Sequence, residues 1–216
     1  MPDGLRERKK TELRDRLSLT TVLLATERGL ANVRVEDIVE RVGVSRRTFS
    51  NYFASKEDAI ADRHVQRAWE AAEALRARPA EEPLWEAVTA AIVVPYLSRS
   101  GAGAAKSKED QDSLIAMLSE PDMQSAVARG MRAATDVLAD AIAERLGTDP
   151  AVDIHPRLVA NAALSTQLLT VEFWLRTDPP GELLPLLRDA FDRLGAGFGE
   201  SADRHPNHHS PEEEQH

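Results

Sequence analysis

Cysteine is absent from the 216 residues, so the chain forms no disulfide bond and offers no thiol nucleophile. It also lacks an uninterrupted apolar run of about 18 residues, the length that a membrane-spanning helix needs. Residues 1–16 are mostly charged, which argues against a secretory signal at the N-terminus. These absences favour a protein of the cytoplasm that does not enter a membrane.

Motifs of common enzymes are missing as well. The sequence has neither a glycine-rich phosphate loop nor a His-Glu-x-x-His metal motif. Four of the six histidines lie within residues 205–216, a segment too polar to hold a metal ion in a fixed geometry. We therefore expect no catalytic residue, no metal and no cofactor.

Alternation of apolar and polar residues, the pattern of a β-strand, is scarce, whereas apolar residues recur every three or four positions. This pattern predicts an all-α fold. A mobile basic arm is expected before the first helix, a loop over 98–105, and a break near Pro95. The expected helices cover about residues 10–28, 35–42, 45–53, 55–78, 83–96, 108–118, 121–146, 155–176 and 183–198.

Charge is divided unevenly along the chain. Residues 1–56 hold 12 Lys and Arg against 8 Asp and Glu, a net charge of +4. Residues 57–216 hold 15 against 28, a net charge of −13. A basic head on an acidic body would turn one end toward nucleic-acid phosphates. We expect a DNA-binding domain over 1–56, a second domain over 57–199 and a disordered tail over 200–216.

The head contains the pattern of a helix-turn-helix. A short amphipathic helix over 35–42 ends at Gly43, because glycine readily adopts the left-handed conformation that closes a helix. Ser45 follows as the cap of the next helix, so the connection has the three-residue length of the motif. Such turns also occur in bundles that never bind DNA. The joint presence of turn, cap, aromatic pair and charged residues favours DNA binding.

The second helix of the motif has two different faces. Phe49 and Phe53, four residues apart, can pack on the preceding helix. The outer face offers guanidinium, amide and hydroxyl groups, which pair with phosphates and base edges. The predicted DNA contacts are Arg34, Ser45, Arg46, Arg47, Thr48, Ser50, Asn51, Tyr52 and Lys56.

The segment Val-Glu-Asp-Ile-Val-Glu-Arg-Val-Gly-Val-Ser-Arg-Arg-Thr-Phe-Ser-Asn-Tyr-Phe-Ala-Ser-Lys-Glu-Asp resembles the DNA-binding segment of the tetracycline-repressor (TetR) family. Glu27-Arg28-Gly29 stands where the family has a similar sequence. Arg34 replaces the usual capping Thr, so the helix over 35–42 should depend more on packing. The resemblance implies a ligand-responsive regulator, most often a repressor, that dimerises through its last two long helices. Residues 46–59 also resemble a subgroup associated with acyl-CoA-like ligands.

The same resemblance implies that the body holds a small-molecule effector. Large apolar side chains there could line a pocket for an apolar effector, or could simply fill the core. The candidates for the pocket are Trp69, Trp85, Tyr96, Met117 and Trp174.

The last two helices carry more apolar surface than one copy can cover. Between the arginines at 157 and 176 the only charged residue is Glu172, so that helix is apolar nearly all round. The next helix has a long apolar stripe. These features predict a homodimer with a four-helix interface. The predicted interface residues are Leu169, Phe173, Leu183, Leu187, Phe191 and Leu194.

Two other functions remain possible on the residues alone. A helical-bundle enzyme for a small apolar substrate would need converging polar groups in the body. A protein-interaction module would use the basic head to bind an acidic partner. We predict a regulator, a repressor or an activator of the same fold, that binds a pseudo-palindromic operator in double-stranded DNA and responds to a small apolar effector.

Overall fold

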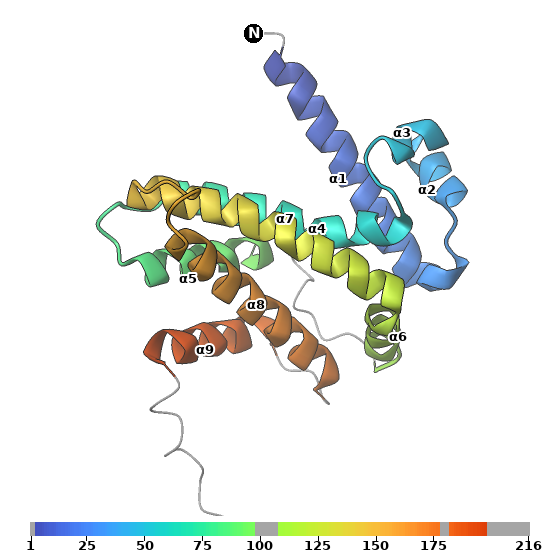
Figure 1. Ribbon diagram of the computed structural model, residues 1–216. Coiled ribbons are helices and arrows are strands. Elements are labelled where there is room, and N and C mark those ends of the chain that lie inside the picture. The colour runs from blue at the N-terminus through green and yellow to red at the C-terminus, as the bar shows by residue number, and fades with distance from the viewer. Residues whose placement is uncertain (1–2, 98–107, 178–181, 198–216) are drawn as a thin grey trace, which may run out of the picture.

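The computed structural model describes residues 3–97, 108–177 and 182–197. Every regular element in these ranges is a helix, which confirms the all-α prediction for this part of the chain (Figure 1). The elements are α1 (Asp3–Arg28), η1 (Leu30–Asn32), α2 (Val35–Val42), α3 (Arg46–Ser50), α4 (Lys56–Arg76), α5 (Leu84–Leu97), α6 (Lys108–Ser119), α7 (Pro121–Leu146), α8 (His155–Arg176) and α9 (Leu183–Ala196).

The head consists of α1, α2 and α3 with the first turn of α4. Its core joins Leu17 and Leu24 of α1 to Ile38 of α2 and to Phe49 and Phe53 around α3. Figure 1 shows α2 and α3 side by side at one end of the molecule, away from α8 and α9. The motif is therefore displayed at an end rather than enclosed.

The body is a bundle in which α7 lies along α4 (Figure 1). Alanines fill much of the contact, including Ala68 and Ala72 of α4 and Ala134 and Ala141 of α7. Small side chains allow two helices to approach closely. Helices α5, α8 and α9 cover the remaining sides and complete one core.

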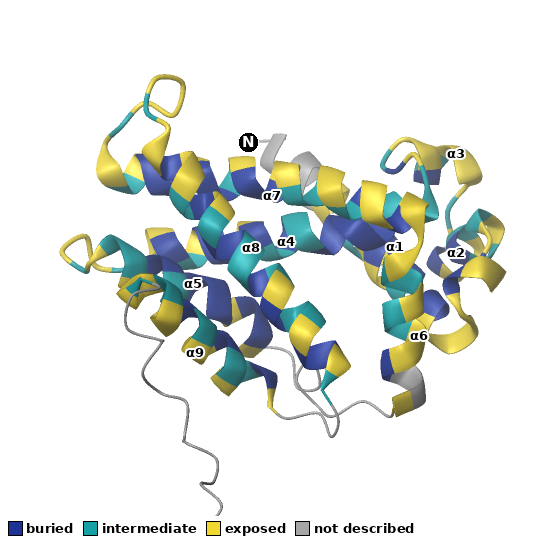
Figure 2. Cartoon of the chain, turned by 60° about the horizontal axis from the view of Figure 1, so that its bottom comes forward, coloured by how far each residue is buried: buried dark blue, intermediate teal, exposed yellow. Residues whose placement is uncertain are grey.

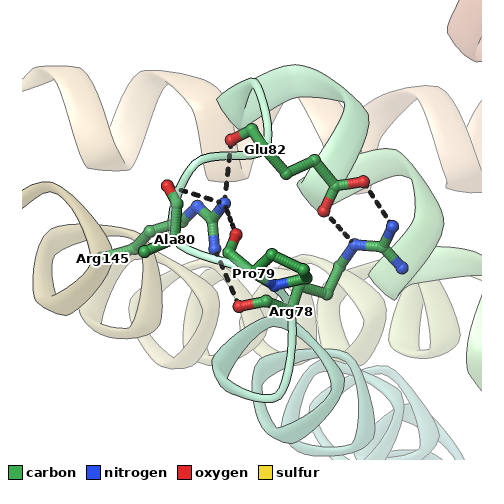
Figure 3. Close-up of polar contacts among 5 residues, drawn as sticks. All are labelled: Arg78, Pro79, Ala80, Glu82 and Arg145. Carbon is green, nitrogen blue, oxygen red and sulfur yellow. Dashed lines mark hydrogen bonds and ion pairs between the residues drawn. The ribbon is translucent and has the colours of Figure 1, made fainter.

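The connection between α4 and α5 is tied down by Arg145 of α7. Its guanidinium donates to the backbone carbonyls of Arg78, Pro79, Ala80 and Glu82 (Figure 3). Arg78 also pairs with the Glu82 carboxylate, and this hydrogen bond lowers the pKa of Glu82. Backbone carbonyls of the connection that follows α4 thus find a donor on a neighbouring helix, which fixes this connection against α7.

Two helix boundaries differ from the predicted ones. Helix α1 begins at Asp3, so the segment expected to be a mobile arm is helical from there on. Helix α5 includes Pro95 and ends at Leu97, one residue beyond the predicted end near Tyr96. Pro95 lies in the last turn, where a missing N–H removes a single helical hydrogen bond, and the buried Tyr96 keeps the turn in the core. The loop expected over 98–105 and the tail expected over 200–216 lie outside the described residues.

Helix α8 is long and apolar enough, by length and composition, to cross a membrane. In the structure its inner side, with Ala160, Leu164 and Trp174, packs in the core of the body. Burial of this side explains part of the apolar character of α8, but not the exposed Leu158, Leu169 and Phe173.

Candidate DNA-binding motif and effector cavity

The turn between α2 and α3 has the geometry expected of a helix-turn-helix. Gly43 has φ 79° and ψ 41°, the left-handed conformation that ends a helix. The backbone N–H groups of Gly43 and Val44 each donate to the carbonyl of Val39 at 2.9 Å. Ser45 then caps α3 by accepting the backbone N–H of Thr48 at 3.1 Å. The predicted turn and cap are both present.

The two faces of α3 are also as expected. Phe49 and Phe53 are 2% and 4% exposed, with ring centroids 5.7 Å apart in the head core. The other side of α3 is exposed at the end of the molecule (Figure 2). The predicted DNA contacts that are exposed there are Arg46, Arg47, Ser50 and Asn51.

Two of the predicted contacts in and just after α3 are only half-exposed. The Thr48 hydroxyl lies 2.9 Å from the Ser45 hydroxyl, so it takes part in the helix cap. Tyr52 lies in the turn after α3, with its ring centroid 6.4 Å from that of Phe53. The recognition helix is therefore shorter than the predicted span over 45–53, and Tyr52 rests partly on the head core.

The arginines at the start of α3 have different surroundings. Arg46 donates to the Glu36 carboxylate at 2.8 Å, and both side chains are exposed. An exposed pair of this kind contributes little to stability and is easily exchanged for a phosphate. Arg47 has no ion-pair partner within the described part of the chain. Its guanidinium is the more available of the two for DNA.

Arg34 occupies the cap position of α2. Its backbone N–H donates to the Asp37 carboxylate at 2.8 Å, which is one half of a capping box. The helix thus does not rely on packing alone, because Asp37 supplies part of the cap that a threonine would give. The Arg34 side chain is exposed at the start of the motif.

Lys56 combines two roles at the start of α4. Its ammonium group donates to the backbone carbonyls of Leu30 at 2.6 Å and Val33 at 2.9 Å. These bonds fasten α4 to the turn that follows α1. An ammonium has three protons, so one remains for the DNA phosphate contact that the sequence predicts.

Helix α4 is joined to the head by an ion pair whose carboxylate is buried. The Asp62 side chain is 2% exposed and accepts hydrogen bonds from Arg14 of α1 at 3.0 and 2.7 Å. Gln66 donates to the second carboxylate oxygen at 3.2 Å. The Arg14 guanidinium also lies over the Phe53 ring, 5.5 Å from its centroid. A buried carboxylate that lost Arg14 would be unpaired, so α1 and α4 move together.

Helix α7 holds α4 close to the head. Arg129 donates to the Asp58 carboxylate at 2.6 Å, within the first turn of α4. Gly130 lies so near that a Cβ atom there would be 2.8 Å from the Ala61 carbonyl oxygen. A glycine is therefore required where α7 crosses α4, and movement of α7 must be passed to α4.

A cavity of about 400 Å³ lies between α6, α7 and α8. Its wall is mostly aliphatic, with Ile115 and Leu118 from α6, Met131 from α7, and Leu168 from α8. Asn161, Ser165, Glu172 and Arg176 of α8 add polar groups. An apolar wall with a few polar groups is the usual composition of a small-molecule site.

The five predicted effector residues do not meet at this cavity. Trp69 is 49% exposed, Trp174 is buried in the core, and the Trp85 indole donates to a backbone carbonyl of α9 at 3.2 Å. The Tyr96 hydroxyl accepts a hydrogen bond from Gln167 at 2.5 Å. Met117 lies at the contact of α6 with α1, beside a hollow of about 70 Å³. Large apolar side chains here mostly fill the core.

The predicted dimer residues divide into two groups. Leu169 and Phe173 of α8 are 64% and 60% exposed, as an interface in a single copy should be. Leu183, Leu187 and Phe191 of α9 are at most 2% exposed and belong to the body's own core. The prediction that these three residues form the interface is therefore corrected, because the apolar stripe of α9 packs inward.

The outward side of α9 meets α8 along a groove of about 600 Å³. Leu194, the sixth predicted interface residue, lines it together with the exposed Leu169 and Phe173. Leu186 and Ala190 of α9 also line it, and neither was among the predicted interface residues. The exposed apolar surface is therefore this groove rather than the stripe of α9.

Comparison with known proteins agrees with both halves of the structure. Residues 20–61 match the family described as "Bacterial regulatory proteins, tetR family", and residues 82–199 match the MftR C-terminal domain. The HTH-type transcriptional regulator TcmR of Streptomyces glaucescens is 32% identical over 197 residues, which cover 88% of this chain and 86% of TcmR. The chain belongs to the TetR family. TetR-family proteins are DNA-binding transcriptional regulators, and the residues that match the family model include α2 and α3.

This TetR-family protein is also similar to a second regulator in sequence and to a solved structure in fold. MftR of Mycobacterium tuberculosis, named as a transcriptional regulator of mycofactocin biosynthesis, is 27% identical and covers 88% of this chain and 93% of its own length. The structure of Thermus thermophilus FadR, a TetR-family repressor in complex with lauroyl-CoA, has a TM-score of 0.54 and 23% identity. It covers 90% of this chain and 99% of FadR. The latter similarity shows that the two folds agree.

In this TetR-family body, α4 carries a histidine that is held neutral. The pKa of His64 is lowered to about 4, first by burial and then by the positive charges of Arg67 and Arg63. Between pH 6.5 and 4 the unfolded chain therefore binds a proton at this position that the folded chain does not.

We expect the free energy of unfolding to fall as the pH is lowered from 6.5 to 4, by at most about 3 kcal/mol from His64. His64→Gln should remove this part of the pH dependence, because the amide does not titrate. Denaturant unfolding at a series of pH values measures it. His155→Gln, at an exposed position, is the control. An unchanged slope in His64→Gln would contradict the assignment.

Proposed function

We propose that this protein is a homodimeric transcriptional repressor that binds a pseudo-palindromic operator and releases it when an apolar effector enters the body. The observation that carries the proposal is the exposed polar face of α3 behind a correctly formed turn. In a two-fold dimer each copy offers one such helix to the major groove, so the operator has two half-sites. A regulator that acts on operator DNA would work in the cytoplasm, where we expect this protein.

The geometry supports a mechanical link between effector and head. The cavity borders α7, and α7 is fixed to the first turn of α4 through Arg129 and Gly130. The head is fixed to α4 through Lys56 and Asp62. An effector that binds one position of α7 better than another therefore changes the separation of the two heads.

The cavity favours an elongated effector that is largely aliphatic. A second hollow of about 420 Å³ between α7 and α8 shares Met131 and Asn161 with the cavity, so the two are neighbours. Arg132 and Arg157 line the second hollow; Arg157 donates to the Asp136 carboxylate at 2.6 Å, so Arg132 is the side chain that would suit an anionic group. Acyl-CoA-like compounds have this combination, and lauroyl-CoA, which FadR binds, is the first compound to test.

Arg47→Ala should weaken operator binding by about 1–3 kcal/mol and leave thermal stability unchanged, because the side chain is exposed and has no ion pair in the described structure. Lys56→Met should lower both operator affinity and thermal stability, since it leaves the carbonyls of Leu30 and Val33 without the ammonium donor. Fluorescence anisotropy of a labelled duplex and thermal unfolding measure the two effects.

Arg188→Ala, at an exposed position on α9, is the matched control and should retain wild-type binding. Wild-type operator affinity in Arg47→Ala would show that α3 does not read the DNA. A stable Lys56→Met protein would show that the two carbonyl bonds are dispensable.

A further inference from the structure

The effector cavity and the exposed groove are neighbours on α8. Glu172 and Arg176 line both of them, the cavity on the side of α6 and α7 and the groove on the side of α9. Successive turns of one helix thus contribute to two hollows that meet at the same two side chains. Whatever covers the groove must also lie against the edge of the cavity.

The groove is suited to a second copy of this chain. A two-fold interface uses one patch twice, so the patch must be complementary to itself. This patch contains both a projecting part and a receiving part. Leu169 and Phe173 are large and mostly exposed, and the hollow beside them is apolar. The groove also carries charges of both signs, since Glu172, Arg176 and Arg193 all line it.

Further apolar surface continues along the same side of α8. Leu158 is 56% exposed and precedes Leu169 by three helical turns, so the two lie on one face. Exposed leucines therefore lie near both ends of this face of the helix, with Ala162 and Ser165 between them. Exposed apolar side chains spread over three turns match a helix-to-helix contact between copies better than a local site for a small ligand.

We propose that the second copy closes the effector cavity, so that each effector site is completed by the partner subunit. This inference rests on the dimer through α8 and α9 that is part of the proposed function. A single copy leaves the cavity bounded by α6, α7 and α8 only. In the dimer, the partner's α8 and α9 cover the groove and form the missing wall beside Glu172 and Arg176.

One consequence is that occupancy of the cavity and dimer formation are linked. An effector held between two copies binds the dimer more tightly than the monomer, so it strengthens dimerisation by the same factor. The effector would then release DNA by changing the spacing of the heads within a tighter dimer, not by separating the copies.

The absence of cysteine allows a test that needs no effector. Ser165→Cys places a single thiol in the cavity wall, at a position that does not line the groove. Its rate of reaction with fluorescein maleimide is measured in the dimer and in a Phe173→Glu background, with sedimentation of the same samples. Val152→Cys, at an 85% exposed position outside both hollows, is the matched control.

We expect the Ser165→Cys thiol to react at least about tenfold more slowly in the dimer, because the reagent enters only when the interface opens. The Val152→Cys thiol should react equally in both states. Leu169→Glu serves as a second monomeric background, and circular dichroism shows that each variant is folded. Equal rates for Ser165→Cys in a proven dimer and in the monomer would overturn the shared cavity alone. A wild-type chain that sediments as a monomer would overturn the proposed dimer as well.

Discussion

Phe173→Glu is expected to convert the dimer into folded monomers and to reduce affinity for a full operator about a hundredfold or more. The side chain is 60% exposed in one copy, so a glutamate there costs the monomer little. In the dimer it would bury a charge against an apolar surface, at a cost of several kcal/mol. Two linked heads gain about 10²–10⁴ in affinity over one head, and the monomer loses this gain.

Sedimentation velocity measures the first effect, and anisotropy titration of a labelled operator measures the second. Val152→Glu introduces the same charge at an exposed position outside the groove and should remain a dimer with wild-type affinity. If Phe173→Glu remains dimeric and binds the full operator normally, the exposed face of α8 is not the interface.

Gly130→Val is expected to destabilise the body and to disturb DNA binding from a distance. The first added atom would lie 2.8 Å from the Ala61 carbonyl oxygen, closer than real contacts allow. The contact is with backbone, so α7 must move away from α4. Overpacking of this kind costs about 1–3 kcal/mol and occasionally more. Because α4 carries Lys56 and Asp62, the head should shift with it.

Thermal unfolding and operator affinity, measured in the same preparations, test this result. Ala133→Val is the matched control, since it adds a β-branched residue at an exposed position on α7. A Gly130→Val protein that keeps wild-type stability and operator affinity would show that α7 and α4 are not tightly coupled.

The helix-turn-helix could be predicted in detail because its signals are local. Gly43 and Ser45 stand next to the backbone groups that they serve, and Phe49 and Phe53 share a face of one short helix. The end of α3 was not predicted correctly. Tyr52 lies in a turn after the helix and packs partly against the head core, a contact that local spacing does not reveal.

The packing of α9 could not be predicted in the same way. Helical spacing shows that Leu183, Leu187 and Phe191 share a face, but not whether that face meets the body or a second copy. In the structure α5 and α8 supply enough apolar surface to cover it. The exposed face of α8 was predicted because that helix is apolar on more than one side.

The lining of the cavity between α6, α7 and α8 could not be predicted for a related reason. The sequence shows that the aromatic residues are large and apolar, yet Trp85 and Trp174 pack in the core, and mostly aliphatic residues line the cavity. One signal in the sequence could have directed attention to α7. Gly130 interrupts a long helical pattern, and a glycine inside a helix often marks close approach of another backbone.

The central claim is that this protein reads a two-fold operator with α3. A gel-shift titration of the wild-type protein against the DNA upstream of its own gene, with an unrelated duplex as competitor, tests it most directly. The account predicts one saturable complex that resists the competitor, contains one dimer per site, and is lost for Arg47→Ala at concentrations where the wild type binds. Equal displacement by the unrelated duplex, or no complex at all, would contradict it.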